Sequence, residues 1–209
     1  DVYKRQIMLL EAKDISYGYT KNNLILDQIS LAIEPGERVA LVGPSGCGKS
    51  TLSQILAGYL TPFSGKVEFK GKPLPKKGYS PVQLIYQHPE RAVNPRWKMK
   101  KILNEAWTPD VNLLRDIGIE TQWLTRYPSE LSGGELQRFC VARALGPETE
   151  FVIADEMSTM LDVITQAQIW QLMLKIVKER ELGLLVVTHS QELAQRVCNR
   201  VVRFEDLKI

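Results

Sequence analysis

The sequence predicts an α/β fold with a mostly parallel core sheet, an N-terminal antiparallel β subdomain and a small inserted helical lobe. Three observations support this fold class. Apolar runs without polar alternation, at 39–42 and 151–154, are typical of parallel strands buried on both faces. Shorter β-rich runs crowd the N-terminal third of the chain. Residues 94–130 lack strand patterns and carry apolar residues at helical spacing.

The β-rich N-terminal part contains five expected strands. The turn at Glu34-Pro35-Gly36 separates two of them, and glycine and proline mark the other boundaries. The expected strands are 9–15, 25–33, 38–42, 66–70 and 82–86. Residues 1–7 precede Met8, where the first strand pattern begins, and are interpreted as a leader that is foreign to the domain.

The remaining elements alternate between helix and strand. A helix is expected over 49–57, ending at Gly58, and the lobe presents apolar residues such as Ile102 and Leu103 at helical spacing. Beyond the lobe we expect helices at 134–145 and 163–181 and strands at 151–155, 184–188 and 200–204. The prediction is one domain over 8–209, with a core of 8–93 and 131–209 and a helical subdomain of 94–130.

Composition places the chain among ordinary globular proteins. Its 209 residues are 44% hydrophobic and 24% charged, and the formal net charge of +3 is too small to imply nucleic acid as a partner. Basic clusters at 70–77 and 96–101 are read as solvated surface, with an anionic membrane surface or partner as the alternative. The three cysteines lack metal-ligand spacing, and the longest apolar stretch, 182–187, is too short to cross a membrane.

A glycine-rich loop follows the buried run 39–42 and precedes a predicted helix. It satisfies the phosphate-loop pattern G-x-x-x-x-G-K-[ST], in which backbone amides surround phosphates at a helix N-terminus. The lysine would neutralise β- and γ-phosphate oxygens, and the serine hydroxyl would ligate Mg²⁺. The residues of this predicted ATP site are Gly43, Ser45, Gly46, Cys47, Gly48, Lys49, Ser50 and Thr51.

Two carboxylates end the apolar strand at 151–155. Asp155 can hold the shell of a Mg²⁺ ion, and Glu156 can orient and partly deprotonate an attacking water. The alternative is that Asp155 and Glu156 are ordinary surface acids at the end of a strand. The phosphate loop upstream favours the catalytic interpretation.

The octapeptide at 131–138, Leu-Ser-Gly-Gly-Glu-Leu-Gln-Arg, lies between the phosphate loop and the paired acids. In this order the chain resembles the nucleotide-binding subunit of an ATP-binding-cassette (ABC) transporter, over about 8–204. In that family the peptide faces the γ-phosphate held by a second subunit in a head-to-tail dimer. The resemblance therefore implies a signature acting in trans, formed by Leu131, Ser132, Gly133, Gly134 and Glu135.

The resemblance also gives meaning to single residues. Gln87 matches a glutamine that contacts Mg²⁺ or the water, and His189 matches a histidine that contacts the γ-phosphate. Tyr19 matches the aromatic residue that stacks on adenine, with Tyr17 as the alternative. Asp162 matches the aspartate of the D-loop, the segment that follows the paired acids.

A longer similarity points to a subfamily, and three departures qualify it. Residues 87–96 and 126–131 look like those of ATPases serving peptide and nickel importers. Met157 to Asp162 stand where the family usually has Pro-Thr-Ser-Ala-Leu-Asp, and this difference alters the surface that faces the second subunit of the dimer. Ser190 replaces the usual Asp after His189, and the loop that carries His189 would then be held in position less firmly. The chain also ends soon after its last predicted strand, where relatives carry an extension.

The resemblance implies an ATP-hydrolysing subunit, with Mg²⁺ as cofactor, that energises an importer of peptides, nickel or a related small solute. Its implied partners are a second ATPase subunit, transmembrane permease subunits and an extracytoplasmic solute-binding protein, but not nucleic acid. The implied location is peripheral, on the cytoplasmic face of the membrane. A soluble non-transport ATPase and a hydrolysis-poor regulatory cassette in a heterodimer are the alternatives. Trp97 is the hypothesised contact with the permease.

Overall fold

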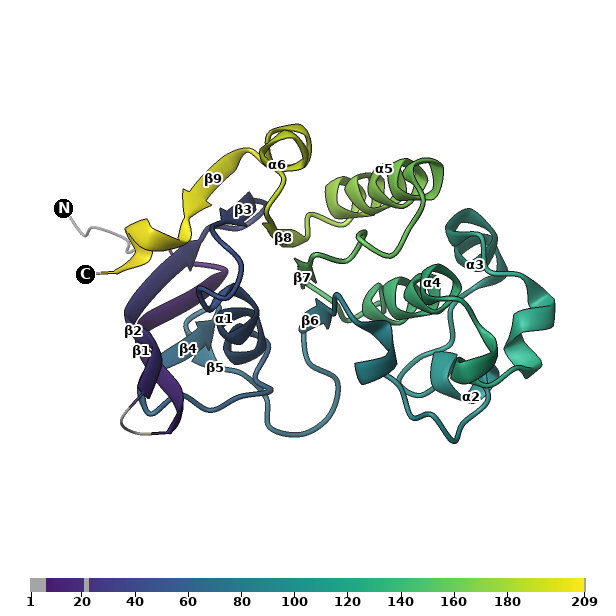
Figure 1. The fold of residues 1–209 in the computed structure, drawn as a ribbon, viewed down its shortest axis with the longest axis horizontal. Coiled ribbons are helices and arrows are strands. Elements are labelled where there is room, and N and C mark those ends of the chain that lie inside the picture. The colour runs from purple at the N-terminus through teal and green to yellow at the C-terminus, as the bar shows by residue number, and fades with distance from the viewer. Residues whose placement is uncertain (1–6, 21–22, 209) are drawn as a thin grey trace.

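A computed structural model describes residues 7–20 and 23–208 of the chain. Of the predicted leader at 1–7, all but Ile7 lies outside the described residues. Within those ranges the predicted fold class is confirmed: a parallel sheet, a separate antiparallel sheet and a helical lobe are present (Figure 1). No helix among the described residues is long and apolar enough to cross a membrane.

The core is a five-stranded parallel sheet in the order β6-β7-β8-β3-β9. Its strands in chain order are β3 (Arg38–Val42), β6 (Val82–Ile85), β7 (Phe151–Asp155), β8 (Gly183–Thr188) and β9 (Arg200–Arg203). In β7 and β8 every residue is buried, as the unbroken apolar runs predict. The sheet therefore has covering elements on both faces.

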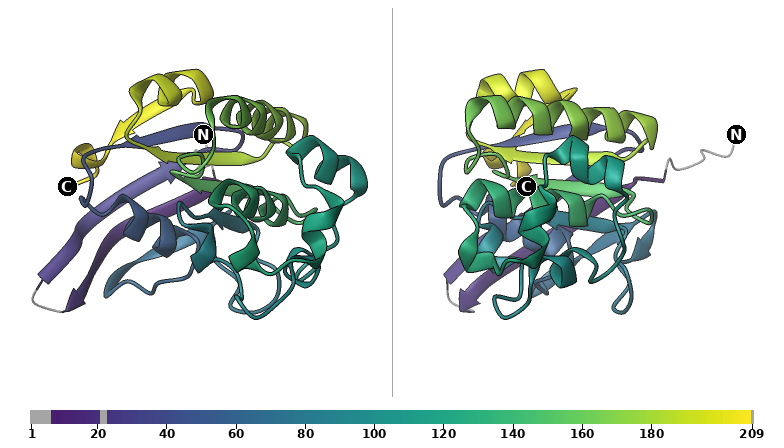
Figure 2. Two further views of the ribbon diagram at one scale, coloured as in Figure 1. Left: turned by 45° about the vertical axis from the view of Figure 1, so that its right-hand side comes forward. Right: turned by 90° about the vertical axis from the view of Figure 1, so that its right-hand side faces the viewer.

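Alternate side chains of these strands enter two different cores. Phe151 and Ile153 pack with α1 (Lys49–Leu56) and the antiparallel sheet, whereas Val152 and Ala154 pack with helices on the opposite face. Those opposite helices are α4 (Gly133–Ala144) and α5 (Val163–Glu179), with α6 (Gln191–Val197) beside them (Figure 2). The two faces separate α1 from α4.

The antiparallel sheet has the order β2-β1-β4-β5, formed by β1 (Leu10–Thr20), β2 (Asn23–Ile33), β4 (Ser64–Phe69) and β5 (Lys72–Pro73). The prediction ended the first strand at residue 15, but pairing with β2 continues to Thr20. Asp14 at φ 51 and several register shifts break the apolar alternation, which is why the sequence pattern stopped early.

The helical lobe is built from short elements packed against α4. These are α2 (Met99–Leu103), α3 (Val111–Ile117) and the 3₁₀ turns η2 (Thr121–Thr125) and η3 (Pro128–Glu130). Trp123 lies 6.5 Å from Phe139 of α4, measured between ring centres, and both rings belong to one core with the parallel sheet. Two further 3₁₀ turns are η1 (Pro89–Arg91), before the lobe, and η4 (Phe204–Leu207), after β9.

Candidate nucleotide site

Four predicted motifs follow the carboxyl ends of four neighbouring parallel strands. Gln87 follows β6, Glu156 follows β7, His189 follows β8, and the phosphate loop follows β3. In the sheet these strands lie in the order β6-β7-β8-β3. Ligands of open α/β sheets bind outside such carboxyl ends, so the topology gathers the motifs at one edge.

The phosphate loop has a conformation that requires glycine. Gly46 and Gly48 have φ angles of 78° and 112°, and a Cβ added at Gly48 would lie 2.9 Å from Leu26 Cδ2. Helix α1 then begins at Lys49 without a side-chain cap. Its first amide groups and the positive end of its dipole are therefore available to an anion.

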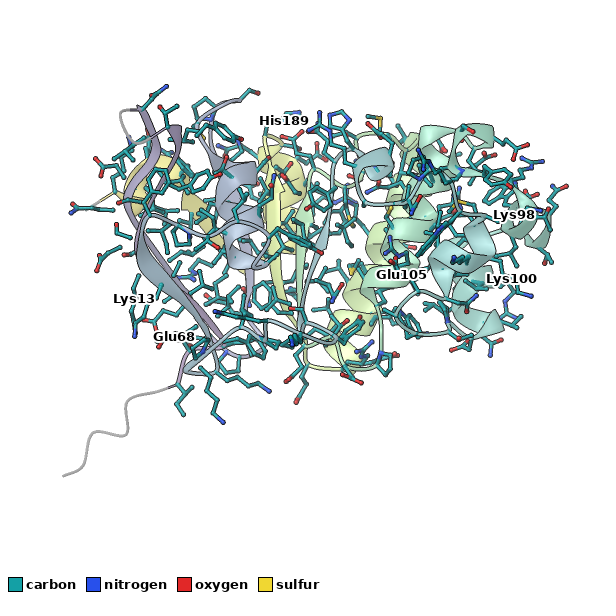
Figure 3. The ribbon with its side chains drawn as sticks, turned by 90° about the horizontal axis from the view of Figure 1, so that it is seen from below. Lys13, Glu68, Lys98, Lys100, Glu105 and His189 are labelled. Atoms are coloured by element: carbon teal, nitrogen blue, oxygen red, sulfur yellow. The ribbon has the colours of Figure 1, made fainter. Side chains whose placement is uncertain are left out.

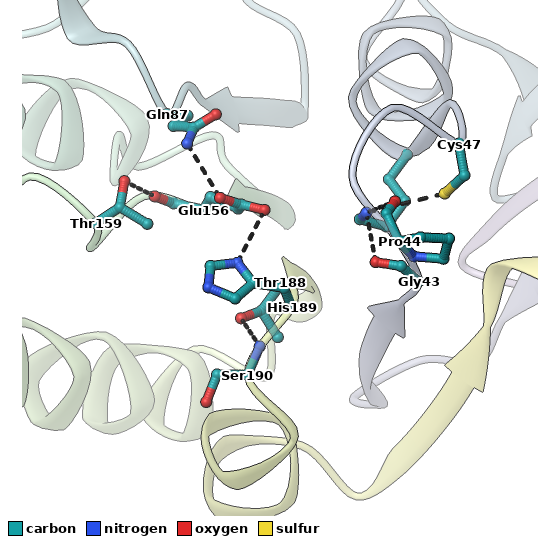
Figure 4. Close-up of polar contacts among 10 residues, drawn as sticks. Gly43, Pro44, Cys47, Gln87, Glu156, Thr159, Thr188, His189 and Ser190 are labelled. Carbon is teal, nitrogen blue, oxygen red and sulfur yellow. Dashed lines mark hydrogen bonds and ion pairs between the residues drawn. The ribbon is translucent and has the colours of Figure 1, made fainter.

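Lys49 is nearly buried, and its charge is held inside the loop. Its side-chain nitrogen donates to the carbonyl oxygens of Gly43 and Pro44, at 2.8 Å each, and lies 3.9 Å from Cys47 Sγ (Figure 4). The ammonium is thus aimed at the space that the loop encloses. Phosphate oxygens, which carry full negative charge, would replace neutral carbonyls as its partners.

Asp155 is a buried carboxylate whose negative charge a bound cation would stabilise. Its side chain is 4% exposed, and Oδ1 has no hydrogen-bond partner among the described residues. Burial raises its pKa above the usual Asp value, although the Ser50 hydroxyl opposes the shift and the charge of Glu156 adds to it. A Mg²⁺ ion fits this oxygen, because hard cations take carboxylate and hydroxyl ligands. Within residues 7–20 and 23–208 no cluster of three His, Cys, Asp or Glu residues forms a protein-only metal site.

Glu156 is fixed between two of the predicted catalytic residues. Gln87 Nε2 donates to one carboxylate oxygen at 3.0 Å, and His189 Nδ1 lies 3.3 Å from the other (Figure 4). The residue has φ 46°, in the left-handed region that non-glycine residues rarely adopt. Such strain is characteristic of functional sites. The Thr159 hydroxyl also donates to the Glu156 carbonyl, at 3.0 Å.

A residue outside the predicted catalytic set supports this arrangement. Gln137 of α4 is fully buried, and its Nε2 donates to the carbonyl oxygen of Tyr86 at 3.0 Å. This bond holds the backbone immediately before Gln87. The signal was present in the octapeptide at 131–138, where a polar glutamine stands among residues that a helix buries.

The signature peptide forms a closed helix start. Ser132 caps α4 by accepting from the Glu135 amide at 3.2 Å, while the Glu135 carboxylate accepts from the Ser132 amide at 2.8 Å. The amides of Gly133 and Gly134 precede the first intrahelical bond, from Leu136 to the Ser132 carbonyl. Backbone donors remain in the first turn, close to a serine hydroxyl.

The phosphate loop and the signature do not meet within one chain. Helix α1 packs on the face of the parallel sheet shared with the antiparallel sheet, whereas α4 packs on the other face. Figure 1 has the two helices on opposite sides of β6 and β7. A phosphate bound at α1 therefore lies beyond the reach of the α4 amides of the same chain.

The D-loop departure from the family pattern lies directly beside the signature. A Cβ added at Gly133 would lie 3.8 Å from Met160 Sδ, and one at Gly134 would lie 3.2 Å from the Met160 carbonyl oxygen. Met160 is 42% exposed, so its side chain forms part of the surface around Gly133. Asp162 caps α5, accepting from the amides of Ile164 and Thr165 at 3.1 and 3.0 Å.

Ser190 takes over the local task expected of the aspartate it replaces. It caps α6 by accepting from the Leu193 amide at 3.2 Å, and its own amide donates to Thr188 Oγ1 at 3.0 Å. Serine and aspartate are comparable N-caps. The turn after His189 is therefore anchored at both ends, and the weakening expected from the loss of the aspartate stays a prediction.

The two candidate tyrosines differ in exposure. Tyr19 is 75% exposed, whereas Tyr17 is partly buried against the core that contains α1. The Tyr17 ring lies 5.5 Å from the Phe63 ring and 5.9 Å from the Tyr19 ring, measured between centres. Of the two rings, that of Tyr19 is therefore the more accessible to a planar base.

Trp97, the hypothesised permease contact, does not line the main groove of the lobe. A cavity of about 720 Å³ lies between the phosphate-loop side of the core and the lobe, and it is lined by Tyr59, Tyr86, Arg91, Glu105 and Trp107, among others. Trp97 instead packs partly buried against the lobe core. Trp107 is held in place by an indole bond to the Arg143 carbonyl, at 2.9 Å.

Comparisons with known proteins agree on one family. The model of the ABC transporter family matches residues 26–159. The nickel import ATP-binding protein NikE of Escherichia coli O6:K15:H31 is 33% identical, over 96% of this chain and 85% of that protein. NikE of Escherichia coli K12 is 34% identical, over 92% of this chain and 79% of that protein.

Solved structures share the fold. The ATP-binding cassette MJ0796, a dimer in a post-hydrolysis state with ADP and Pi, has a TM-score of 0.80 at 24% identity, over 96% of both chains. The cbiO1 protein of Clostridium perfringens, part of the ABC transporter complex cbiONQ, has a TM-score of 0.73 at 24% identity, over 94% of this chain and 84% of that one.

Proposed function

Because the chain belongs to the ABC transporter family of ATP hydrolases, we propose that it uses ATP hydrolysis to drive import of nickel, a peptide or a related small solute. The named function of the NikE relatives supports the direction and the cargo class. The observation that carries the hydrolytic part is the Glu156 carboxylate between Gln87 and His189, next to the buried Asp155.

Each catalytic side chain has a distinct task in this proposal. Lys49 and the amides at the start of α1 bind the β- and γ-phosphates, and Tyr19 stacks on the adenine. Glu156 orients the attacking water and accepts its proton, while Gln87 and His189 hold the carboxylate in position. The second nitrogen of the His189 ring would contact the γ-phosphate, as the family resemblance implies.

Mg²⁺ bound with the triphosphate would supply charge neutralisation at the β- and γ-oxygens. The unpartnered Asp155 oxygen, the Ser50 hydroxyl and Gln87 are the groups that would hold it. Asp155 must be ionised for this purpose. Its raised pKa therefore makes the metal compete with a proton at that oxygen.

Substitution of Glu156 by Gln tests the hydrolytic role. ATP binding should be retained, since the neutral isostere still fits between its neighbours. Steady-state hydrolysis should fall by about 10²- to 10⁴-fold, the usual contribution of general acid–base catalysis. Glu148→Gln is the matched control, because Glu148 is exposed and precedes the start of β7, whereas Glu156 follows the end of that strand. Equal hydrolysis by both variants would remove Glu156 from the base role.

A second cassette completes the site in this proposal. The signature of one chain faces the phosphate loop of the other, through the amides of Gly133 and Gly134 and the Ser132 hydroxyl. The separation of α1 and α4 on opposite sheet faces supports a head-to-tail dimer. The dimer described for MJ0796, with ADP and Pi, is consistent with this assembly. The D-loop aspartate, Asp162, would lie at the same junction.

The groove of about 720 Å³ is the proposed site for a cytoplasmic segment of the permease. The chain would then lie peripherally on the cytoplasmic face of the membrane, and a solute-binding protein would deliver the cargo outside.

Tyr59→Ala should reduce co-purification with the permease, because Tyr59 is 59% exposed at the groove. Phe63→Ala is the control, since Phe63 is 50% exposed and outside the groove. Equal co-purification of both variants would exclude the groove.

Transport itself is tested by reconstitution with the permease and the solute-binding protein. ATP-dependent uptake of Ni²⁺ or of a labelled peptide should require this chain and should be lost in Glu156→Gln. Hydrolysis without coupled uptake of either cargo would contradict the import proposal. It would then favour the soluble non-transport alternative.

A hydrolysis-poor cassette in a heterodimer is the second candidate function. The exposed Met160 beside Gly133 favours it, because a bulky side chain there narrows access to the signature amides. Met160→Ala distinguishes the two candidates. A large rise in ATP hydrolysis would support the regulatory cassette, and an unchanged rate would support a competent enzyme.

A further inference from the structure

A basic and aromatic patch lies around the start of α2 on the helical lobe. Its members are Arg96, Lys98, Lys100, Lys101 and Arg126, with the aromatic residues Trp97 and Tyr127. Four of the cations are exposed, and Arg126 is half-buried. Within the described residues 7–20 and 23–208, none of the five cations lies within ion-pair distance of a carboxylate.

The packing of α2 creates this patch. Met99, Ile102 and Leu103 are buried in the lobe, which leaves Lys100 and Lys101 on the outer side of the same helix. Lys101 Nζ lies 3.8 Å from the centre of the Trp97 ring, and Lys98 Nζ lies 5.9 Å from that of Tyr127. Aromatic faces attract an ammonium without cancelling its charge, so the patch keeps its positive potential.

Helix α2 links the patch to the proposed permease groove. Leu103 at the C-terminal end of α2 and Glu105 just beyond it line the groove, and Figure 3, seen from below relative to Figure 1, has Lys98, Lys100 and Glu105 on the lobe. A permease segment would enter the groove from the membrane. The patch next to it would therefore be turned towards the bilayer. The orientation of the patch towards the bilayer is the one part of the inference that rests on the proposed function.

We propose that this patch binds the anionic headgroups of the membrane around the permease. Clusters of four to eight Lys or Arg residues beside a bilayer attract anionic lipids. The exposed Tyr127 suits the boundary between water and hydrocarbon, because one end of its ring is polar. None of the five cations lines the groove, so they face outwards, as contact with an extended lipid surface requires.

Two other classes of partner fit this surface less well. Single-stranded nucleic acid binds through open aromatic faces, but Trp97 packs against the lobe core and lies under Lys101. The formal net charge of +3 is also low for a nucleic-acid-binding domain. An acidic protein segment would be expected to use a groove with arginine forks, whereas three of these five cations are lysines.

The test is co-sedimentation of the whole chain, without nucleotide or permease, with vesicles of phosphatidylcholine or of phosphatidylcholine and phosphatidylglycerol. Binding should require phosphatidylglycerol and should weaken as salt is added. Lys98→Gln, Lys100→Gln and Lys101→Gln together should reduce partitioning by about 100-fold, since each lysine near such a surface contributes about fivefold. ATP binding by this variant should be unchanged, which establishes that it is folded.

The matched control removes the same charge from the other lysine cluster, by replacing Lys72, Lys76 and Lys77 with Gln. These three lysines are exposed, and no aromatic ring lies under their ammonium groups among the described residues. The control should retain most of the vesicle binding. Equal losses in both triple variants, equal binding to neutral vesicles, or tighter binding to DNA or an acidic peptide than to anionic vesicles would each overturn the proposal. A chain that binds vesicles but drives no uptake would contradict the proposed function alone.

Discussion

Two helix starts, those of α1 and α4, carry the same predicted task but are built differently. Helix α1 follows Gly48, has no side-chain cap and has Lys49 as its first residue. Helix α4 has a reciprocal cap, in which Ser132 and Glu135 satisfy each other's amides. The first start is open and carries a cation, whereas the second is partly closed by its own cap and carries a carboxylate.

This difference indicates which start binds nucleotide by itself. Helix dipoles and amides contribute modestly to anion binding, whereas a buried ammonium contributes a full charge. The nearest arginine on α4, Arg138, is committed to the Ile117 carbonyl at 2.8 Å and the Thr165 hydroxyl at 2.9 Å. The α4 start can therefore complement a phosphate that is already bound, but it lacks the charge to capture one.

The largest effect is expected from removal of the α1 charge. Lys49→Met keeps the length of the side chain but leaves the phosphates without their cation, so ATP affinity should fall by about 100-fold. Calorimetry or nucleotide fluorescence measures this affinity. Lys66→Met, at an exposed lysine paired with Glu68, is the control and should bind ATP normally. A loss of less than about threefold in Lys49→Met would contradict the division between the two starts.

The second prediction concerns the α4 start. Ser132→Ala should lower the free energy of unfolding by about 1 kcal/mol, because the helix loses its cap. It should also lower ATP hydrolysis by about tenfold, with ATP affinity little changed, because the hydroxyl acts only across the dimer.

Asp110→Ala provides the matched control for this variant. Asp110 caps α3 by accepting from the Leu113 amide at 2.9 Å, outside the nucleotide motifs. Its loss should destabilise the chain to a similar extent without a change in hydrolysis. Equal hydrolysis by the two variants would show that Ser132 serves only to cap its helix.

A smaller effect is expected at Asp155, where the α1 side of the site keeps a carboxylate oxygen without a partner among the described residues. Burial raises its pKa, so the folded chain holds this proton more tightly than the unfolded chain. Its contribution to stability is therefore greatest in acid and is lost as pH rises through the folded-state pKa. At neutral pH, Asp155→Asn should raise the free energy of unfolding by about 1 kcal/mol without ligand.

The same variant should lose the stabilisation that Mg-ATP gives to the unmodified chain. Thermal unfolding with and without Mg-ATP measures both effects. Asp116→Asn, at an exposed aspartate beside Arg115, should change neither. A lower midpoint of thermal unfolding for Asp155→Asn than for the unmodified chain, both without Mg-ATP, would contradict the proposal that this carboxylate is stabilised only when it holds a cation.

The smallest effect concerns the thiol inside the open loop. Burial raises the pKa of the Cys140 and Cys198 thiols to about 12, so a maleimide at neutral pH should label mainly Cys47. Mg-ATP should slow that labelling by about threefold, because the loop closes around phosphate. Lys49→Met should lose this protection. Equal labelling rates with and without nucleotide in the unmodified chain would contradict the predicted protection of Cys47.

Local chemistry made some features predictable and left others open. The phosphate loop was predictable because glycines, lysine and serine at this fixed spacing are typical of one local structure, and its two positive-φ glycines agree with that interpretation. The resemblance favoured Tyr19 over Tyr17 as the adenine contact, although both residues stand on the same strand. Only the tertiary structure shows that their exposure differs, because Phe63, which is distant in the sequence, packs beside Tyr17.

The tertiary structure also revealed contacts whose partners the sequence did not indicate. Gln137 supports the backbone at Tyr86 across 51 positions of sequence, and Met160 lies beside Gly133. Trp97, the hypothesised permease contact, does not line the groove, whose aromatic lining comes from Tyr59, Tyr86 and Trp107. These contacts join segments that become neighbours only after the sheet has formed.

The sequence alone determined which chemical groups this protein brings to a phosphate: a lysine, a serine, two carboxylates and two helix starts. Residue identity and short-range spacing suffice for that, because a glycine loop or a helix cap is a local property. Only the tertiary structure decided which groups meet. The strand order β6-β7-β8-β3 brings Gln87, Glu156 and His189 together, while the two faces of the same sheet keep α1 and α4 apart. Strand order depends on long-range burial, which no local motif encodes.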